Sequence, residues 1–288
     1  MPNLRNIRHR IKSVSSTEQI TRAMQMVAAS KMRKAQQATL TTRPFGQLLY
    51  RIQRHAVTHA RDFKHPLLAV REVRKRAVIL VGTDKGLCGS LNANLFRTAA
   101  QFDPATTVYI GVGKRAAQFI ARSGRKLAAE FSFTDSPRFD ETRPIVALAR
   151  NMFLKGDVDQ VQIAATRFVS TMVQKPLVVE FLPIGDIKAL DTDADAEGMD
   201  GGSREIVFEP SAEAVLSYLL GHYLNILLHR VLLEAKASEQ SARMVAMTNA
   251  SDSASGLVKD LTLEYNKLRQ GSITNEILEI SGGQLNND

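Results

Sequence analysis

The chain has few residues that could form disulfides or metal sites, stack on nucleic-acid bases or interrupt its long helices. One cysteine, Cys88, is present among 288 residues, so the sequence excludes an internal disulfide and a cysteine-rich metal site. Tryptophan is absent and tyrosine occurs five times, which leaves little aromatic surface for stacking on nucleic-acid bases. No run of eighteen apolar residues occurs, so the sequence predicts no membrane-spanning segment.

Acidic residues are scarce at one end of the chain. Residues 1–76 hold seventeen Lys or Arg against three Asp or Glu, a charge of +14, so the remainder carries −5 of the net +9. A basic helix of this kind is typical of a partner that is acidic, and nucleic acid, anionic lipid and an acidic protein loop all fit. A solvated helix face is the alternative that needs no partner.

Proline is missing from the whole stretch that follows Pro210. Residues 211–284 predict one helix, which at 1.5 Å per residue would be on the order of 100 Å long. Large apolar residues recur at helical spacing up to Leu232 and return after Gly256. Between them lies a row of small side chains four residues apart: Ser238, Ala242, Ala246, Ala250 and Ala254. Such a row drifts by about 40° per step, which indicates close approach of neighbours on several sides.

The N-terminal segment has the same two kinds of zone, one with apolar residues at helical spacing and one with small residues. Leu4, Ile7, Ile11 and Val14 have coiled-coil spacing, and a small-residue zone follows at 21–37. Pro44 is expected to kink this helix or to restart it. Two long helices with matching zones at opposite ends of a chain predict an antiparallel coiled coil.

Between the helices, residues 76–209 have the rhythm of an α/β fold. Apolar strands are expected at 77–81, 107–112 and 127–131, with a closing pair at 158–169 and 175–183, and helices at 91–102, 114–122 and 142–155. This alternation predicts a Rossmann-like, mainly parallel sheet. We therefore expect three segments: an N-terminal helix at 1–75, the inserted domain at 76–209 and a C-terminal helix at 210–288.

The loop after the first expected strand, residues 82–90 (GTDKGLCGS), is the sharpest local motif. Its glycines would let backbone N–H groups approach an anion, but it lacks the Lys and Ser/Thr that follow the last glycine of a P-loop, and it lacks dinucleotide-binding spacing. Nucleotide binding, a structural turn and a protein contact all stay open from these residues. Cys88 has no adjacent base, which favours a partly buried small apolar side chain over a nucleophile. The acidic residues between 191 and 200 lack the order of a calcium loop.

Four segments together resemble the gamma subunits of F-type ATP synthases. They are residues 20–32 (ITRAMQMVAASKM), 82–89 (GTDKGLCG), 238–247 (SEQSARMVAM) and 265–277 (YNKLRQGSITNEI). They cover both ends and the middle of the chain in the family's order.

The resemblance implies a central-stalk rotor that is not itself catalytic and needs neither cofactor nor metal. Its implied partners are three alpha and three beta subunits, an epsilon subunit and a ring of c subunits, with no nucleic acid. It implies beta-subunit contacts at Met24, Lys85, Cys88 and Arg243, a polar catch at the tip at Arg269, Gln270, Thr274, Glu276 and Glu279, and a foot on the c ring at Glu205, Phe208 and Glu209.

Two further expectations concern location and competing functions. The sequence pattern shows no secretory or transit signal before the first helix. Together with this, the resemblance implies a peripheral protein on the cytoplasmic side of a bacterial inner membrane. The alternatives are a basic coiled-coil protein that binds nucleic acid and a nucleotide-using enzyme built on the α/β segment. The first would show steep salt dependence of DNA binding, and the second lacks a complete phosphate loop.

Overall fold

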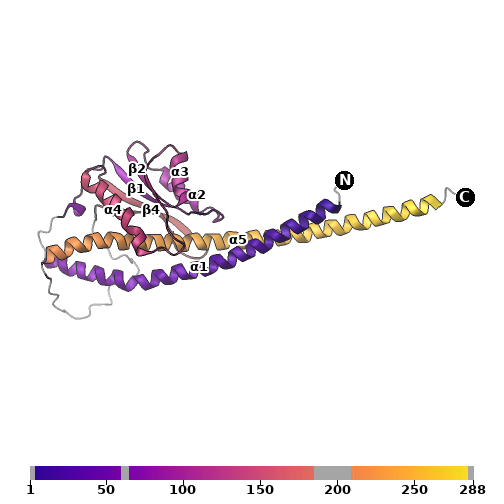
Figure 1. The fold of residues 1–288 in the computed structure, drawn as a ribbon, viewed down its shortest axis with the longest axis horizontal. Helices are drawn as coiled ribbons and strands as arrows, with labels where there is room; N and C mark the ends of the chain where they lie inside the picture. Colours follow the sequence, from indigo (N-terminus) through magenta and orange to yellow (C-terminus); the bar gives the residue numbers. More distant parts are fainter. Residues whose placement is uncertain (1–3, 60–64, 185–208, 210, 285–288) are drawn as a thin grey trace. The chain divides into compact units, whose positions relative to one another are not determined.

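The computed structural model describes residues 4–59, 65–184, 209 and 211–284, with side chains described at these positions except 42–59, 212 and 279–284. The chain forms two compact units (Figure 1). One consists of residues 29–242, and the other combines residues 1–28 with 243–288. Two long helices, α1 (Leu4–His59) and α5 (Ala212–Gln284), belong to both units.

A five-stranded sheet forms the centre of the unit at 29–242. Its order is β3-β2-β1-β4-β5, with β3, β2, β1 and β4 parallel and β5 antiparallel to β4. The mainly parallel α/β sheet and the closing strand pair predicted from the sequence are thus confirmed. The strands are β1 (Arg76–Val81), β2 (Thr107–Val112), β3 (Lys126–Phe131), β4 (Gln160–Phe168) and β5 (Gln174–Leu182).

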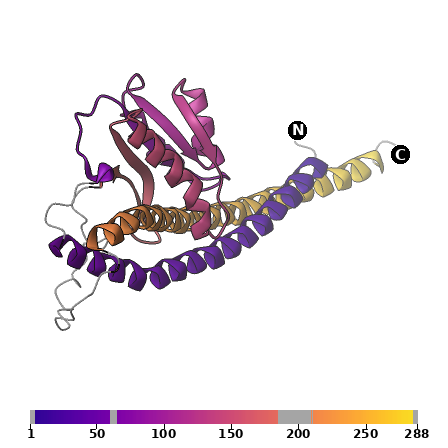
Figure 2. The same cartoon turned by 60° about the vertical axis from the view of Figure 1, so that its left-hand side comes forward.

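The central strands are apolar on both sides because helices cover both faces of the sheet (Figures 1 and 2). On one face, Leu95 and Ala99 of α2 (Leu91–Ala100) and Ile120 of α3 (Lys114–Arg122) pack on β1 and β2. On the other face lies α4 (Phe139–Lys155), through residues such as Ile145 and Phe153. This double burial explains the uninterrupted apolar run of β1.

The first part of α5 is a structural layer of the same unit. Leu220, Leu224, Leu227 and Leu228 are buried in one cluster with α4 and the sheet. Their three- and four-residue spacing aligns them on one face of the helix. This part of α5 is therefore fixed to the α/β domain by its core. A short 3-10 helix, η1 (Pro66–Leu68), adds Leu67 to that cluster.

The unit formed by residues 4–28 and 243–284 is a pair of helical segments that run antiparallel (Figures 1 and 2). Ile7 is buried on one segment, and Met247, Ala254 and Leu261 are buried on the other. Apolar residues at heptad-like spacing bury themselves only against a partner, so these positions mark the helix contact. This antiparallel pairing agrees with the sequence prediction.

Three local details differ from the expectation or sharpen it. α1 is one helix through Pro44, so it does not restart there. α4 begins at Phe139, earlier than the expected residue 142, and accommodates Pro144 because the missing N–H costs a single bond within its first turns.

Within the described residues no helix is long and apolar enough to cross a bilayer. The three-segment division at residues 75 and 209 stays a prediction.

Candidate functional site: a polar loop, a charged cluster and the tip of the long helix

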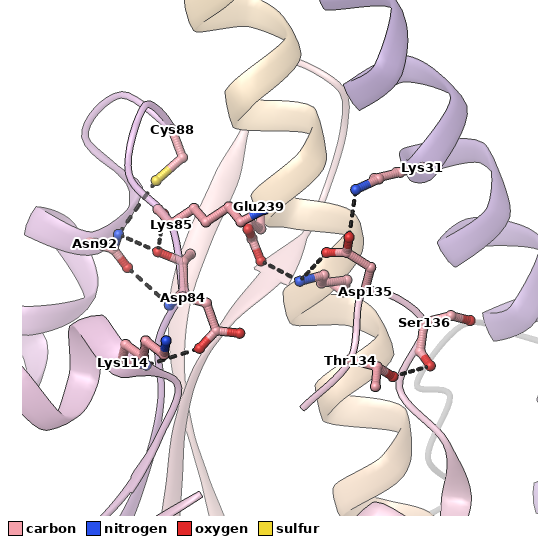
Figure 3. Close-up of polar contacts among 12 residues, drawn as sticks. Lys31, Asp84, Lys85, Cys88, Asn92, Lys114, Thr134, Asp135, Ser136 and Glu239 are labelled. Carbon is pink, nitrogen blue, oxygen red and sulfur yellow. Dashed lines mark hydrogen bonds and ion pairs between the residues drawn. The ribbon is translucent and has the colours of Figure 1, made fainter. Parts of the chain in front are cut away.

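The β1–α2 loop is held by its own polar groups (Figure 3). Thr83 is buried, and its Oγ1 donates to the carbonyl of Lys85 at 2.8 Å and accepts from Asn92 Nδ2 at 2.7 Å. Asn92 Nδ2 also lies 3.4 Å from the sulfur of Cys88. One asparagine on the first turn of α2 therefore fixes both ends of the loop.

Two glycines let this loop pack against the start of α3. A Cβ on Gly82 would lie 3.0 Å from the backbone nitrogen of Ala116. Gly113 has φ 95°, and a Cβ there would meet the Gly82 carbonyl oxygen at 2.5 Å. Any side chain would force these segments apart, so the glycines here have a packing reason.

The carboxylate of Asp84 in this loop lies at the N-terminus of α3. Asp84 Oδ1 accepts the backbone N–H of Lys114, the first residue of α3, at 3.0 Å. A helix N-terminus attracts an anion, and here the attracted group is part of the chain. Of the interpretations left open by the sequence, this geometry favours a structural turn that also offers a protein contact.

The two loop residues implied by the family resemblance lie differently. Lys85 is exposed, and Figure 3 shows its side chain directed toward Glu239 of α5. Cys88 is only 3% exposed. Its burial agrees with the interpretation as a packed small side chain.

A charged cluster of Lys31, Asp135, Lys236 and Glu239 lies beside this loop (Figure 3). Asp135, in the β3–α4 loop, has one oxygen 2.5 Å from Lys31 Nζ and the other 3.2 Å from Lys236 Nζ. Glu239 lies 3.1 Å from Lys236 Nζ, and the Phe133 ring centroid lies 5.1 Å from that nitrogen. The Lys236 side chain is 3% exposed and Glu239 is 5% exposed. Buried charges of this kind persist because they are paired and hydrogen-bonded.

The two lysines hold the pKa of Asp135 at about 2, below its ordinary 3.8. The largest cause is the hydrogen bond from Lys31, and the hydrogen bond from Lys236 acts in the same direction, whereas partial burial opposes both. Asp135 is therefore a carboxylate throughout the physiological pH range.

The β3–α4 loop that carries Asp135 is braced on both sides. Thr134 Oγ1 donates to the Ser136 carbonyl at 2.7 Å, and Glu141 of α4 accepts the Thr134 backbone N–H at 3.3 Å. On the α5 side, His229 Nε2 lies 3.1 Å from the Pro137 carbonyl, a contact in which the ring nitrogen donates. Asp135 is thus presented by a loop with little freedom.

Other implied contact residues lie in the unit of residues 1–28 and 243–288. Met24 is half-buried and Arg243 is 8% exposed. At the tip, four residues are exposed, and Thr274 Oγ1 donates to the Gln270 carbonyl of its own helix at 2.9 Å. The exposed residues are Arg269, Gln270, Thr274 and Glu276.

Three residues implied by the family resemblance have side chains that the structure does not describe. Glu205, Phe208 and the acidic stretch at 191–200 lie outside the described residues, and so does the side chain of Glu279. Glu209 is exposed. Among the residues that are described, no group of three or more His, Cys, Asp or Glu side chains could hold a metal ion.

Sequence reasoning missed the charged cluster. Lys31 and Asp135 are separated by 104 positions, and no periodicity connects them. The available signal was Lys236 and Glu239, a charged pair three residues apart in a stretch otherwise made of Ala, Ser and Gln.

Comparison with known proteins gives one consistent family. A family model described as ATP synthase matches residues 3–285. A protein named ATP synthase gamma chain from Opitutus terrae is 44% identical over 291 residues, covering 99% of each chain. One of the same name from Methylacidiphilum infernorum is 40% identical over 289 residues, again covering 99% of each.

Solved structures show the same fold. The central stalk of the Tetrahymena thermophila mitochondrial ATP synthase matches with a TM-score of 0.61 at 21% identity, covering 81% of this chain and 99% of that one. The rotor of the Euglena gracilis mitochondrial ATP synthase matches with a TM-score of 0.65 at 20% identity, covering 94% and 98%.

Proposed function

The chain belongs to the family of ATP synthase gamma chains, and from this premise we propose that it is the rotor of the central stalk. In this role it couples rotation of a c ring, driven by ion flow, to conformational change in catalytic beta subunits. The observation that carries the proposal is the match along the whole chain, at 44% identity to a gamma chain over 99% of both lengths.

The division of the chain suits transmission of torque. The α/β domain would be the foot that the c ring turns, through the segment containing Glu205, Phe208 and Glu209. α5 shares the core of that domain through Leu224 and its neighbours, and the same helix continues to the tip. Rotation of the foot would therefore turn the pair of helices with it.

The residues proposed to contact beta subunits offer complementary chemistry. Lys85 is exposed on the β1–α2 loop, and Arg243 and Met24 belong to the small-residue zones, where a thin helix pair would turn inside a ring of alpha and beta subunits. Cys88 would contribute by packing the loop rather than by reacting. Basic residues here would meet acidic loops of beta.

The tip would form a polar catch. Arg269 and Gln270 are exposed on α5, followed by Thr274 and Glu276, and the proposed catch ends at Glu279. An arginine can donate two parallel hydrogen bonds to one carboxylate, which fixes orientation as well as distance.

The chain would be non-catalytic by itself and would bind no cofactor. The β1–α2 loop supports this part of the proposal because it lacks the Lys and Ser/Thr that follow the last glycine of a P-loop. Partners would be three alpha and three beta subunits, epsilon and the c ring. Through the c ring the chain would sit peripherally on the cytoplasmic side of a bacterial inner membrane.

Reconstitution tests this function. ATP hydrolysis is measured for matched alpha and beta subunits with this chain, without it, and for the chain alone. We expect strong stimulation with co-elution of all three, and no hydrolysis by the chain alone. Absence of co-assembly would contradict the proposal, and a DNA titration with steep salt dependence would then favour the basic-coiled-coil alternative.

A further inference from the structure

We infer that Asp135 is the positioning residue that ties α1 to the α/β domain and α5 within the unit at residues 29–242, so that these parts of the unit turn together. This inference rests on the proposed rotor function. It assigns a role in coupling to a residue outside the four segments that carry the family resemblance, and it depends on contacts within the unit at 29–242.

The two helices are attached to the domain in different ways. The core cluster around α4 and the sheet contains six residues of α5, from Leu220 to Ala235, but none from the part of α1 whose side chains are described, residues 4–41. Lys31 of α1 instead contacts the domain through the ion pair with Asp135. An apolar core fixes α5 to the domain, whereas α1, which also buries Ala28, Met32 and Ala35, contacts the β3–α4 loop through this ion pair.

Asp135 serves both helices at once. Its two oxygens are divided between Lys31 and Lys236, so one carboxylate bridges α1 and α5. Charge-assisted hydrogen bonds of this type are directional and about twice as strong as neutral ones.

Burial makes the α5 side of the bridge costly to break. Lys236 is nearly inaccessible, and its described charge partners are Asp135 and Glu239. If Asp135 becomes neutral, Lys236 keeps one carboxylate and Lys31 loses the ion pair that joins it to the loop. Two hydrogen bonds connect the β3–α4 loop to its neighbours: Glu141 joins it to α4, and His229 joins it to α5.

The chain offers a matched control for this residue. Asp140 lies five positions away, its side chain is 54% exposed against 53% for Asp135, and it also forms an ion pair, with Arg138. That pair lies within one segment and joins no helices. Asp135→Asn and Asp140→Asn therefore remove the same charge from similarly exposed sites, and only the first removes the bridge.

The experiment uses complete ATP synthase in inverted membrane vesicles. ATP hydrolysis and ATP-driven ion transport are measured on the same preparation, after the amount of chain in each complex is shown to equal wild type. For Asp135→Asn we expect hydrolysis to be retained and ions moved per ATP to fall below wild type, because α5 alone then links the domain to the tip. Asp140→Asn should match wild type.

A transport ratio equal to wild type in assembled Asp135→Asn complex would overturn the inference and leave the rotor function intact. If wild-type complex itself showed no coupling, the proposed function would fail instead. If Asp135→Asn does not assemble, Lys31→Gln decides, because it removes the α1 contact and leaves the pair between Asp135 and buried Lys236 in place. An unchanged ratio in assembled Lys31→Gln complex would equally overturn the inference.

A second measurement separates coupling from general stability. With nucleotide absent and the alpha and beta subunits immobilised, a probe on the α/β domain reports angular fluctuation of the foot. The distribution should be broader in Asp135→Asn than in Asp140→Asn at a temperature where both complexes stay assembled. Equal widths would contradict a role in holding the domain to the helices.

Discussion

Asp135 should make the stability of the chain depend on pH. Its folded pKa, about 2, lies below its ordinary 3.8, so its ion pairs stabilise the folded state fully above about pH 4. That contribution disappears as the pH falls toward 2. The melting temperature of Asp135→Asn should therefore lie below wild type at pH 7, and the difference should shrink between pH 4 and pH 2. A difference that stays constant over this range would contradict the assignment.

Arg269 is predicted to need its guanidinium and not merely its charge. Arg269→Lys keeps the charge but loses the paired hydrogen bonds that a carboxylate accepts from arginine, so coupled ATP synthesis or assembly should weaken. Lys267→Arg, two residues away and also exposed, is the control and should be neutral. Normal ATP synthesis by the Arg269→Lys complex would contradict the proposed role of Arg269 in the catch.

Residue roles could be read from the sequence only where a local pattern exists. The absence of a base beside Cys88 favoured a packed side chain over a nucleophile, and Cys88 is buried in the structure. The bridge between Lys31, Asp135 and Lys236 could not be foreseen, because Asp135 lies between exposed Thr134 and Ser136 in a loop with no periodicity. Only the folded chain brings its partners to it.

At the scale of the element, the core contact between α5 and the sheet should be costly to lose. Leu224 is completely buried among residues of α4 and the sheet. Leu224→Ala should lower the free energy of unfolding by about 2–5 kcal/mol, from lost burial and the cavity left behind. Leu263→Ala, at a position 72% exposed, should change it by less than about 0.5 kcal/mol. Denaturant titration of both variants measures this, and equal effects would contradict the packing described.

The small-residue zone of α5 is predicted to keep the helix pair thin. Ala246 and Ala250 are half-buried, and replacing both by Leu should overpack the neighbouring surface and slow turnover of the assembled complex. ATP hydrolysis by reconstituted complex measures the effect. Leu263→Ala complex provides a comparison on an exposed face. Unchanged turnover in the double variant would show that thinness is not required.

The elements themselves were largely predictable. Each strand of the α/β segment was expected within two residues of its observed ends, because apolar runs buried between helix layers have a strong sequence signal. The start of α4 was expected at residue 142 but lies at Phe139, and Pro144 lies inside the helix. α1 likewise continues past Pro44. Pro144 lies near the start of its helix and Pro44 lies in the interior of α1, so a proline does not fix a helix boundary by itself.

At the scale of the whole molecule, the basic charge is concentrated at one end of the sequence, with seventeen Lys or Arg against three Asp or Glu in residues 1–76. We propose that basic residues of this segment steer assembly toward acidic loops of beta subunits. Contacts of this kind are screened by salt, so the rate of assembly with alpha and beta subunits should fall as ionic strength rises. A stopped-flow series from low to high salt measures it, and a rate independent of salt would contradict a steering role for this charge.

Rotation of the α/β domain is the property that most directly tests the proposed rotor function. The measurement immobilises an assembly of alpha and beta subunits with this chain and attaches a visible probe to the α/β domain, at an exposed residue such as Lys155. During ATP hydrolysis we expect stepwise rotation of the probe in one direction. A probe that stays stationary while the same assembly hydrolyses ATP would contradict it.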